Sequence, residues 1–267
     1  MEKSDIAKIV LEVLNEKKSC GIIDEIEFED ISNSISSRIL DGYRTLSIVL
    51  AHANTDFRRK ILGECLDSLV YSKIFLSTNY PVGVDIQNKC DYFIFSKDNP
   101  LLMKDEFSKY GLSYYKWWTK DGIRYEESFE YEHGYAVYDL IKKGLMSAID
   151  LYGGDSTVNI INYDYVINQK TISDNLVLLS SFDIVFYRYE SDVESYSTGF
   201  ISGRISALMS FFSEFSNKDE YYSNSVGFNT LERKMYSFYK DRGFKIKEID
   251  FGELKSECSV DREYVFS

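Results

Sequence analysis

Proline and cysteine are both scarce in this chain. Two prolines among 267 residues exclude Pro-rich linkers or stalks. The four cysteines, Cys20, Cys65, Cys90 and Cys258, form no C-x-x-C pair and lack the spacing of a zinc site. Cys65 and Cys90 lie in apolar patterns, which predicts buried thiols and a reducing compartment.

Long apolar runs are absent as well. Crossing a bilayer takes roughly 20 consecutive apolar residues. The longest candidate, from Leu176 to Tyr187, is interrupted by Ser180, Ser181 and Asp183. The first residues, MEKSDIAKIVLEVLNEKK, contain acidic side chains and no continuous apolar stretch of the signal-peptide type. We therefore expect no membrane span and a cytoplasmic location.

Positive charge is in deficit. The chain has 31 Lys and Arg against 43 Asp and Glu, which gives a formal net charge of −12. Such a chain repels a phosphate backbone, so nucleic acid is disfavoured as a partner unless basic residues gather on one side. The G-x-x-x-x-G-K-S/T phosphate loop, G-x-G-x-x-G, G-x-S-x-G and H-E-x-x-H signatures are all missing. With only two histidines, a catalytic triad has no support.

The chain divides by pattern into two segments. Residues 1–42 include an amphipathic helical pattern over 5–17 and an acidic run, DEIEFED, over 24–30. We interpret them as an acidic helical N-terminal extension that packs or forms a homodimer, or alternatively docks a partner. Residues 43–267 are long enough to bury the core of one α/β domain.

Apolar runs alternate with helical patterns after Tyr43. Strands are expected at 46–51, 73–77, 92–95, 157–161, 177–188 and 244–251, and helices at 57–69, 85–90, 134–149, 199–215 and 228–240. This alternation predicts an α/β fold of the Rossmann-related kind, with a mixed, mainly parallel sheet flanked by helices. Ligands of such sheets bind at the carboxyl ends of the strands, so residues 52–55, 77–80 and 96–99 should line one rim.

The tripeptide Asn162-Tyr163-Asp164 ends a buried strand. Alternation along a strand would place Asn162 and Asp164 on one face. Two oxygen-bearing side chains there could hold a divalent cation together with a diphosphate, because Mg²⁺ typically takes only one or two protein carboxylates. The alternative is that the tripeptide serves only as a turn.

Polar residues also follow other expected elements. His52 and Asn54 come where the first strand ends and a helix begins, a place that favours an anion. Asp98 and Asn99 follow the third strand, and Thr198 with Gly199 is interpreted as a lip that leads into a helix. The alternative is structural: a packed histidine, helix caps and turns.

Three blocks resemble a glycosyltransferase of the GT-A type. They are VLAHANTDFRRKILGECLDSL, FLSTNYPVGVDIQNKCDYFIFSKDNPLL and HGYAVYDLIKKGLMSAIDLYGGDSTVNIINYDY. More narrowly, they are similar to small glycosyltransferase-like proteins of bacteria and large phages. The resemblance covers about residues 43–240, so the N-terminal extension lies outside it.

The resemblance implies a nucleotide-sugar donor. The donor would contact Ala51, His52, Asn54, Thr78, Asn79, Asp98, Asn99, Asn162 and Tyr163. Asp164 would match the last carboxylate of the family's D-x-D motif and, with Asn162, bind the Mn²⁺ or Mg²⁺ that neutralises the leaving diphosphate. The sequence departs from the family in two ways. Asn162 replaces the first aspartate, and no histidine occurs late in the chain, where many such enzymes complete the metal shell.

The catalytic base and the acceptor are less defined. Candidate bases for an inverting reaction are Asp183, Glu190, Asp192, Glu194 and Glu232, of which we select Asp192 and Glu232 alongside Asp164. We place Trp117 and Trp118 on the acceptor side with Thr198 and Gly199, where the indoles could stack on a sugar or a base. Otherwise the tryptophans are core or dimer residues and the carboxylates are solvated charges.

The leading hypothesis is thus transfer of a sugar from a nucleotide-sugar donor to a glycan, a small molecule, a protein or a modified phage DNA base. The alternative is a GT-A-like binding or structural protein without catalysis, for which Asn162 and the absent late histidine are the motivation. A nucleotidyltransferase is a weaker third hypothesis, because HANTD is not the Gly-rich loop that such enzymes usually need.

Overall fold

A computed structural model of the chain describes residues 18–19, 45–69, 72–97, 100–112, 115–120, 123–128, 130–188, 194–223, 231–240 and 242–257. The chain divides into two compact units, Met1–Thr45 and Leu46–Ser267. The helix expected over 5–17 lies outside the described residues, and the boundary after residue 42 stays a prediction. All that follows concerns the second unit and the first strand, which begins at Thr45.

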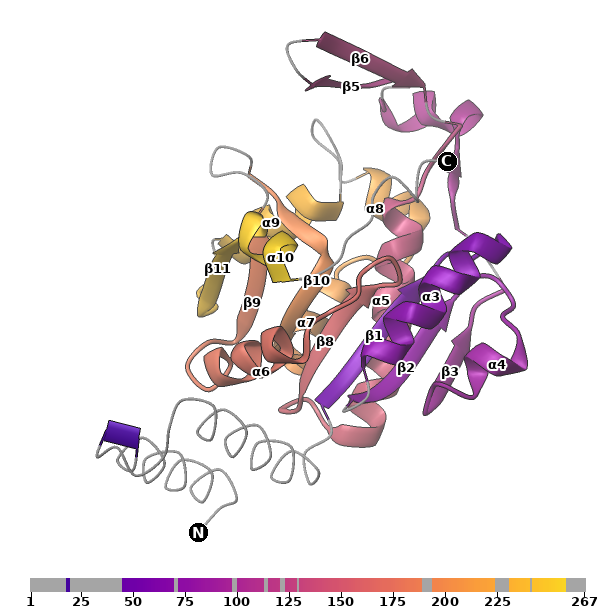
Figure 1. Cartoon of the computed structure of the whole chain (residues 1–267). Coiled ribbons are helices and arrows are strands. Elements are labelled where there is room, and N and C mark those ends of the chain that lie inside the picture. Colours follow the sequence, from indigo (N-terminus) through magenta and orange to yellow (C-terminus); the bar gives the residue numbers. More distant parts are fainter. Residues whose placement is uncertain are drawn as a thin grey trace. The chain divides into compact units, whose positions relative to one another are not determined.

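Seven strands form one sheet in the order β11-β9-β10-β8-β1-β2-β3 (Figure 1). They are β1 (Thr45–Ala51), β2 (Ser72–Thr78), β3 (Tyr92–Phe95), β8 (Thr157–Asn162), β9 (Ile184–Arg188), β10 (Tyr196–Arg204) and β11 (Ile246–Asp250). The pairs β1–β8, β2–β3 and β9–β11 are parallel, whereas β10 runs antiparallel to both of its neighbours. The predicted mixed, mainly parallel α/β sheet is confirmed.

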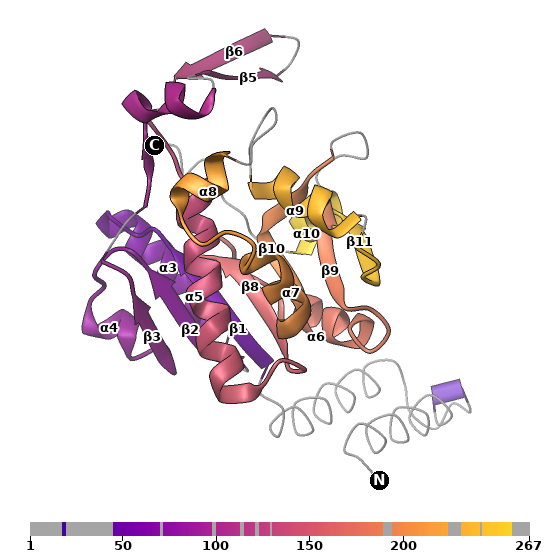
Figure 2. The ribbon, with the colours of Figure 1, turned by 180° about the vertical axis from the view of Figure 1, so that it is seen from behind.

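Helices cover both faces of the sheet (Figures 1 and 2). One face packs against α3 (Asp56–Ser68), α4 (Val84–Gln87), α6 (Gln169–Leu178) and α10 (Phe251–Glu257). The other face packs against α5 (Gly134–Tyr152), α7 (Ile205–Phe212), α8 (Lys218–Ser223) and α9 (Leu231–Lys240). Between β3 and α5 lie β4 (Leu102–Met103), the 3₁₀ helix η1 (Lys104–Tyr110), β5 (Tyr115–Lys120), β6 (Ile123–Ser128) and β7 (Tyr131–Glu132).

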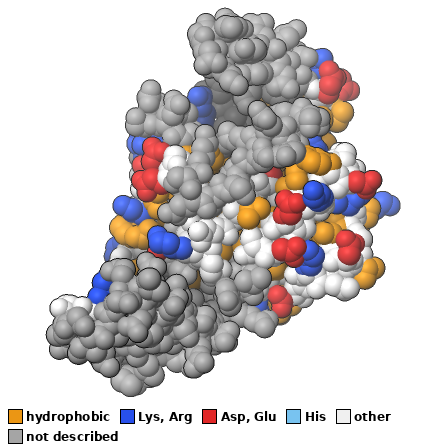
Figure 3. Space-filling view, in the orientation of Figure 1, with side chains coloured by type: hydrophobic (Ala, Val, Ile, Leu, Met, Phe, Trp, Pro, Cys, Tyr) orange, Lys and Arg blue, Asp and Glu red, His pale blue; other side chains and the backbone are white. Residues whose placement is uncertain are grey.

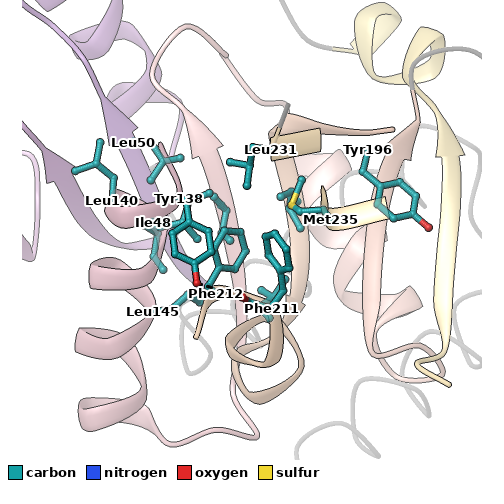
Figure 4. Close-up of a cluster of buried hydrophobic side chains, with 14 of the residues drawn as sticks. Ile48, Leu50, Tyr138, Leu140, Leu145, Tyr196, Phe211, Phe212, Leu231 and Met235 are labelled. Carbon is teal, nitrogen blue, oxygen red and sulfur yellow. Dashed lines mark hydrogen bonds between the residues drawn. The ribbon is translucent and has the colours of Figure 1, made fainter. Parts of the chain in front are cut away.

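The alternation of side chains along β1 explains its continuous apolar sequence. Ile48 and Leu50 point to the layer of α5 and α7, where aromatic side chains of both helices surround them (Figure 4). Val49 and Ala51 point to the opposite layer, against α3. Because every residue of β1 is buried, a polar residue is tolerated there only with a partner, as when the Ser47 hydroxyl donates to that of Ser72 at 3.0 Å.

Two predicted elements are wrong. Residues 199–204, expected in a helix over 199–215, continue strand β10, and the helix begins only at Ile205. The region 177–188, expected as one strand, contains the end of α6 and then β9. The apolar spacing of Phe200, Ile201 and Ile205 fits a helix as well as a strand, and packing of β10 between β8 and β9 decides for the strand.

Candidate functional site

The order of the strands defines where a ligand would bind. From β1 the chain proceeds to β2 and β3 on one side, and on the other side β1 pairs with β8. In open α/β sheets, ligands bind outside the carboxyl ends of the strands at such a switch point. Leu50 of β1 lies opposite Asn162 of β8, and the Leu50 carbonyl accepts from the Tyr163 N–H at 3.0 Å. We call residues 52–55, 79–80 and 163–165, which follow β1, β2 and β8, the strand-end rim.

The β1 end of the rim carries His52 and Asn54. Thr55 caps α3 by accepting from the Arg58 N–H at 3.2 Å, and Asn54 Oδ1 accepts from the Arg58 guanidinium at 3.0 Å. Arg58 therefore stands in the first turn of α3, beside the positive end of the helix dipole. Arg58 and the helix N-terminus both contribute positive charge to this corner, where Asp56 of the same turn pairs with Arg59. The Ala51 side chain is fully buried in the core, so only its backbone could contact a donor.

The β2 end of the rim is a tight turn. The Thr78 hydroxyl accepts from the Tyr80 N–H at 3.1 Å and donates to the Tyr80 carbonyl at 3.0 Å, while Asn79 is buried between them. The turn holds the Tyr80 ring edge-on to the His52 imidazole, with 4.7 Å between the ring centroids. The β1 and β2 ends of the rim thus meet side chain to side chain.

His52 is held in its neutral form. Burial lowers the pKa of the imidazole from 6.5 to about 4, and the positive charges of Arg58 and His133 add to the effect. A neutral imidazole offers one donor and one acceptor instead of a charge. His52 can therefore bind a polar group of a ligand near neutral pH without changing its own protonation.

The β8 end of the rim carries Asn162, Tyr163 and Asp164. The strand ends at Asn162, where the carbonyl accepts from the Tyr165 N–H at 3.1 Å, so Tyr163 and Asp164 form a turn. The strand alternation that we used to place Asn162 and Asp164 on one face therefore stops at Asn162, because turn formation overrides it. Burial raises the pKa of the Tyr163 phenol, while the charge of Arg58 lowers it and that of Asp164 raises it.

The rim fits a metal only in combination with a ligand. Asn162 and Asp164 are both half-buried, and Oδ1 of Asp164 is shielded from solvent. Among the residues that the structure describes, no three His, Cys, Asp or Glu side chains cluster as a metal site. A single carboxylate supplemented by phosphate oxygens is nevertheless a usual arrangement for Mg²⁺. The residues present therefore fit a cation that arrives with a diphosphate.

The antiparallel strand β10 starts beside the end of β8. Thr198 and Gly199 lie within this strand and are not a lip before a helix, which corrects that prediction. The Thr198 hydroxyl donates to Glu232 of α9 at 3.0 Å. Gly199 lies under the ring of Tyr165, whose hydroxyl would come within 2.2 Å of a Cβ added at residue 199. The structure thus brings Thr198, Gly199 and Glu232 to the same edge as Asp164.

Other predicted site residues divide into two groups. Asp98, Asn99, Glu190 and Asp192 lie outside the described residues, as do the side chains of Trp117 and Trp118, whose backbone forms β5. Asp183 precedes β9, at the opposite edge of the sheet from the rim, and accepts from the Lys245 N–H at 2.9 Å. Asp183 is therefore excluded as a base. Glu194 pairs with Lys240 at 3.3 Å.

Sequence reasoning missed three side chains near the rim. Glu132 and His133 immediately precede α5, and the charge of His133 reaches His52. Gln169 begins α6, and its side-chain N and O are shielded from solvent without a hydrogen-bond partner among the described residues. A ligand or water would satisfy such an amide. Glu132 and His133 follow no strand of the main sheet, so the strand-end rule could not find them, whereas Gln169 begins the helix that follows β8.

The structure has hollows elsewhere. One of about 700 Å³ lies between α3 and α4, and one of about 300 Å³ lies between α6, β11 and α10. The predicted site residues line neither. The first is ringed by charged pairs such as Lys89–Asp67, and Figure 3 shows acidic and basic side chains side by side there. Charges that neutralise one another in this way give no preference for a charged ligand.

The chain resembles solved structures more than it resembles known sequences. No protein-family model matches the chain, and no curated protein matches it. The chain is similar to the crystal structure of a glycosyltransferase involved in the glycosylation of the major capsid of PBCV-1. Identity is 12% and the TM-score is 0.38, over 77% of this chain and 81% of the other. The likeness is loose, and the function proposed below rests on this chain's own residues.

A helix must be both long and apolar to cross a bilayer. Within the described part of the chain, none combines the length and the apolar character needed to cross a bilayer.

Proposed function

We propose that the chain is a glycosyltransferase that uses a nucleotide-sugar donor together with Mn²⁺ or Mg²⁺. The observation that carries the proposal is that Arg58 and the N-terminus of α3 follow β1, that Asp164 follows the paired strand β8, and that the charges of Arg58 and Asp164 both act on the pKa of Tyr163. A carboxylate together with an arginine and a helix N-terminus suits a metal–diphosphate pair, because the metal binds the carboxylate while the phosphates meet the cationic side.

The roles of the chain's own residues follow from their positions. Arg58 and the first N–H groups of α3 would bind phosphate oxygens, and Asp164 with Asn162 would hold the metal. When bound, the metal would neutralise charge on the leaving nucleoside diphosphate. His52 and Tyr80, with Asn79 beside them, form a mainly uncharged surface that suits the nucleoside. The acceptor would supply a hydroxyl group.

A donor screen tests the proposal. UDP-, GDP-, CMP- and TDP-sugars are added with and without Mn²⁺, and the unfolding temperature and the release of free sugar are measured. A donor at about 100 times its dissociation constant should stabilise the fold by about 2.7 kcal/mol. We expect one nucleotide class to stabilise the protein in a metal-dependent way. Asp164→Asn should lose the metal dependence.

The matched control is Asp174→Asn. Asp174 is an exposed carboxylate of α6 that pairs with Lys170 at 2.9 Å, away from the rim. This variant should respond to donor and metal like the wild type. If none of the donors stabilises the wild type, the proposal is wrong.

The second candidate is donor binding without catalysis, which Asn162 in the place of an aspartate favours. The same screen separates the two functions. Metal-dependent stabilisation without release of sugar, and without transfer to any acceptor in a glycan and small-molecule panel, would favour the binding protein.

A further inference from the structure

Glu132 lies just before α5, at the same edge of the sheet as the rim. It ends β7, two residues before Gly134 begins α5. Because α5 leads back into the parallel strand β8, its N-terminus lies at the carboxyl edge of the sheet, as the rim does (Figure 1). His133, the residue before α5, also acts electrostatically on His52 at the β1 end of the rim.

The carboxylate of Glu132 is fixed in place. Oε1 accepts from the Gly134 N–H at 2.8 Å, and Oε2 accepts from the Tyr222 hydroxyl of α8. A Cβ at residue 134 would lie 2.8 Å from Oε1 of Glu132 and 2.8 Å from the Tyr221 hydroxyl. A Cβ at residue 134 would therefore displace the Glu132 carboxylate or the Tyr221 hydroxyl from this arrangement. Each carboxylate oxygen has a second lone pair, which can accept from a bound hydroxyl.

A second carboxylate stands near the first. Glu232 of α9 binds the Thr198 hydroxyl at the start of β10, and its negative charge raises the pKa of Glu132. Burial is the larger cause of that rise, while Tyr222, His133 and the Gly134 N–H oppose it. Lys234 packs over the Tyr221 ring at 4.7 Å, and its burial lowers its own pKa to about 8. The titratable and charged groups around Glu132 are Tyr221, Tyr222, His133, Glu232 and Lys234.

We infer that Glu132 is the catalytic base that takes the proton of the acceptor hydroxyl in an inverting transfer. The inference rests on the proposed function. The hydroxyl proton passes to a carboxylate oxygen of Glu132 as the acceptor oxygen forms a bond to the anomeric carbon. The bond from that carbon to the diphosphate breaks, and its electron pair leaves with the diphosphate. Glu232, the base selected from the sequence, accepts from the Thr198 hydroxyl, and its role as a base stays a prediction.

The raised pKa suits this role. A general base works best when its pKa approaches the working pH, since it is then basic enough to take the proton and still ionised. The rate should therefore fall as the pH drops through the pKa of Glu132. That acidic limb should lie above the usual range of a glutamate, because burial and Glu232 raise the pKa.

The test uses Glu132→Gln, which keeps the size and the hydrogen bond from Gly134. Water serves as acceptor, and release of sugar from the donor identified by the screen is followed against pH. We expect Glu132→Gln to bind the donor with unchanged stabilisation and to release sugar about 10²–10⁴-fold more slowly, without the acidic limb. Glu130→Gln is the matched control, since Glu130 is an exposed neighbour that pairs with Lys104 at 3.0 Å. It should behave like the wild type.

Tyr222→Phe provides a second readout. Removing the hydroxyl that lowers the pKa of Glu132 should move the acidic limb to higher pH while donor binding is kept. A wild-type rate in Glu132→Gln would overturn the inference, as would loss of donor binding together with rate, or a wild type that binds donor and releases no sugar at any pH. A wild type that binds no donor contradicts the proposed function itself, so the two failures can be told apart.

Discussion

At the scale of single residues, the protein places ionisable side chains where burial changes their protonation. His52 is the clearest case, because the fold keeps its imidazole neutral at a pH where the unfolded chain would protonate it. The pKa is about 4 in the folded protein against 6.5 ordinarily. The unfolded state therefore binds more protons between these two values, and the free energy of unfolding falls as the pH is lowered from about 6.5 to about 4.

This linkage gives a prediction for His52→Gln. Between pH 7 and pH 5 the wild type should lose about 1 kcal/mol more stability than the variant, after discounting for the partial exposure of the imidazole. Denaturant unfolding of both proteins at the two pH values measures the difference. Carboxylates titrate equally in both proteins and cancel. Equal losses in the wild type and the variant would show that His52 does not contribute to the pH dependence of the free energy of unfolding.

At the scale of elements, β10 depends on close approach at Gly199. The Tyr165 ring covers this glycine and is itself buried, so it has no space into which to move. Gly199→Ala should destabilise the fold by about 1–3 kcal/mol through overpacking. Thermal or denaturant unfolding measures the change.

Gly63→Ala is the control with the opposite expected sign. A Cβ there lies 3.6 Å from Ile86, an ordinary contact, and alanine in a helix interior is favoured by roughly 0.5–1 kcal/mol.

A double variant tests whether the Tyr165 ring is the obstacle at residue 199. Truncating this ring should relieve its clash with the added Cβ, so Gly199→Ala and Tyr165→Ala together should cost less than the sum of the two single changes. Strict additivity would mean that the ring is not the obstacle.

The same element shows how far the sequence could predict this fold. The apolar runs of β1, β2 and β8 occur where expected, since strands buried on both faces leave a continuous apolar signal. The run of β3 also occurs where expected, although this edge strand leaves Phe93 and Phe95 exposed. Residues 199–204 of β10 are the exception, because their apolar spacing also fits a period of 3.6 and predicts a helix, and only the neighbouring strands select the strand.

The candidate site was predictable to a similar extent. Residues that directly follow parallel strands, such as His52 and Asp164, come to one edge by topology alone. Glu132 reaches the same edge through an excursion of the chain after β3, and its hydrogen-bond partner Tyr222 lies 90 residues further along the chain. No local pattern encodes a contact over that separation.

At the scale of the whole molecule, the net charge and the local charge at the rim have opposite signs. The chain has a formal net charge of −12, yet Arg58 and the N-terminus of α3 contribute positive charge to one corner of the rim. At physiological ionic strength the Debye length is about 8 Å, so a small anion bound at this corner is screened from most of the acidic surface. A nucleotide-sugar can therefore bind where a long polyanion cannot.

Duplex DNA supplies the corresponding prediction. Its backbone would extend over many ångströms of surface on which acidic and basic side chains are intermixed (Figure 3). Few counterions would then be released, so at physiological salt we expect binding weaker than the ~10⁻⁴ M limit of ordinary non-specific association. Fluorescence anisotropy of labelled duplex, titrated with the protein at several salt concentrations, measures this. Tight binding that weakens steeply with salt concentration would reveal a basic surface that makes several phosphate contacts. Modified DNA would then become the leading candidate for the acceptor.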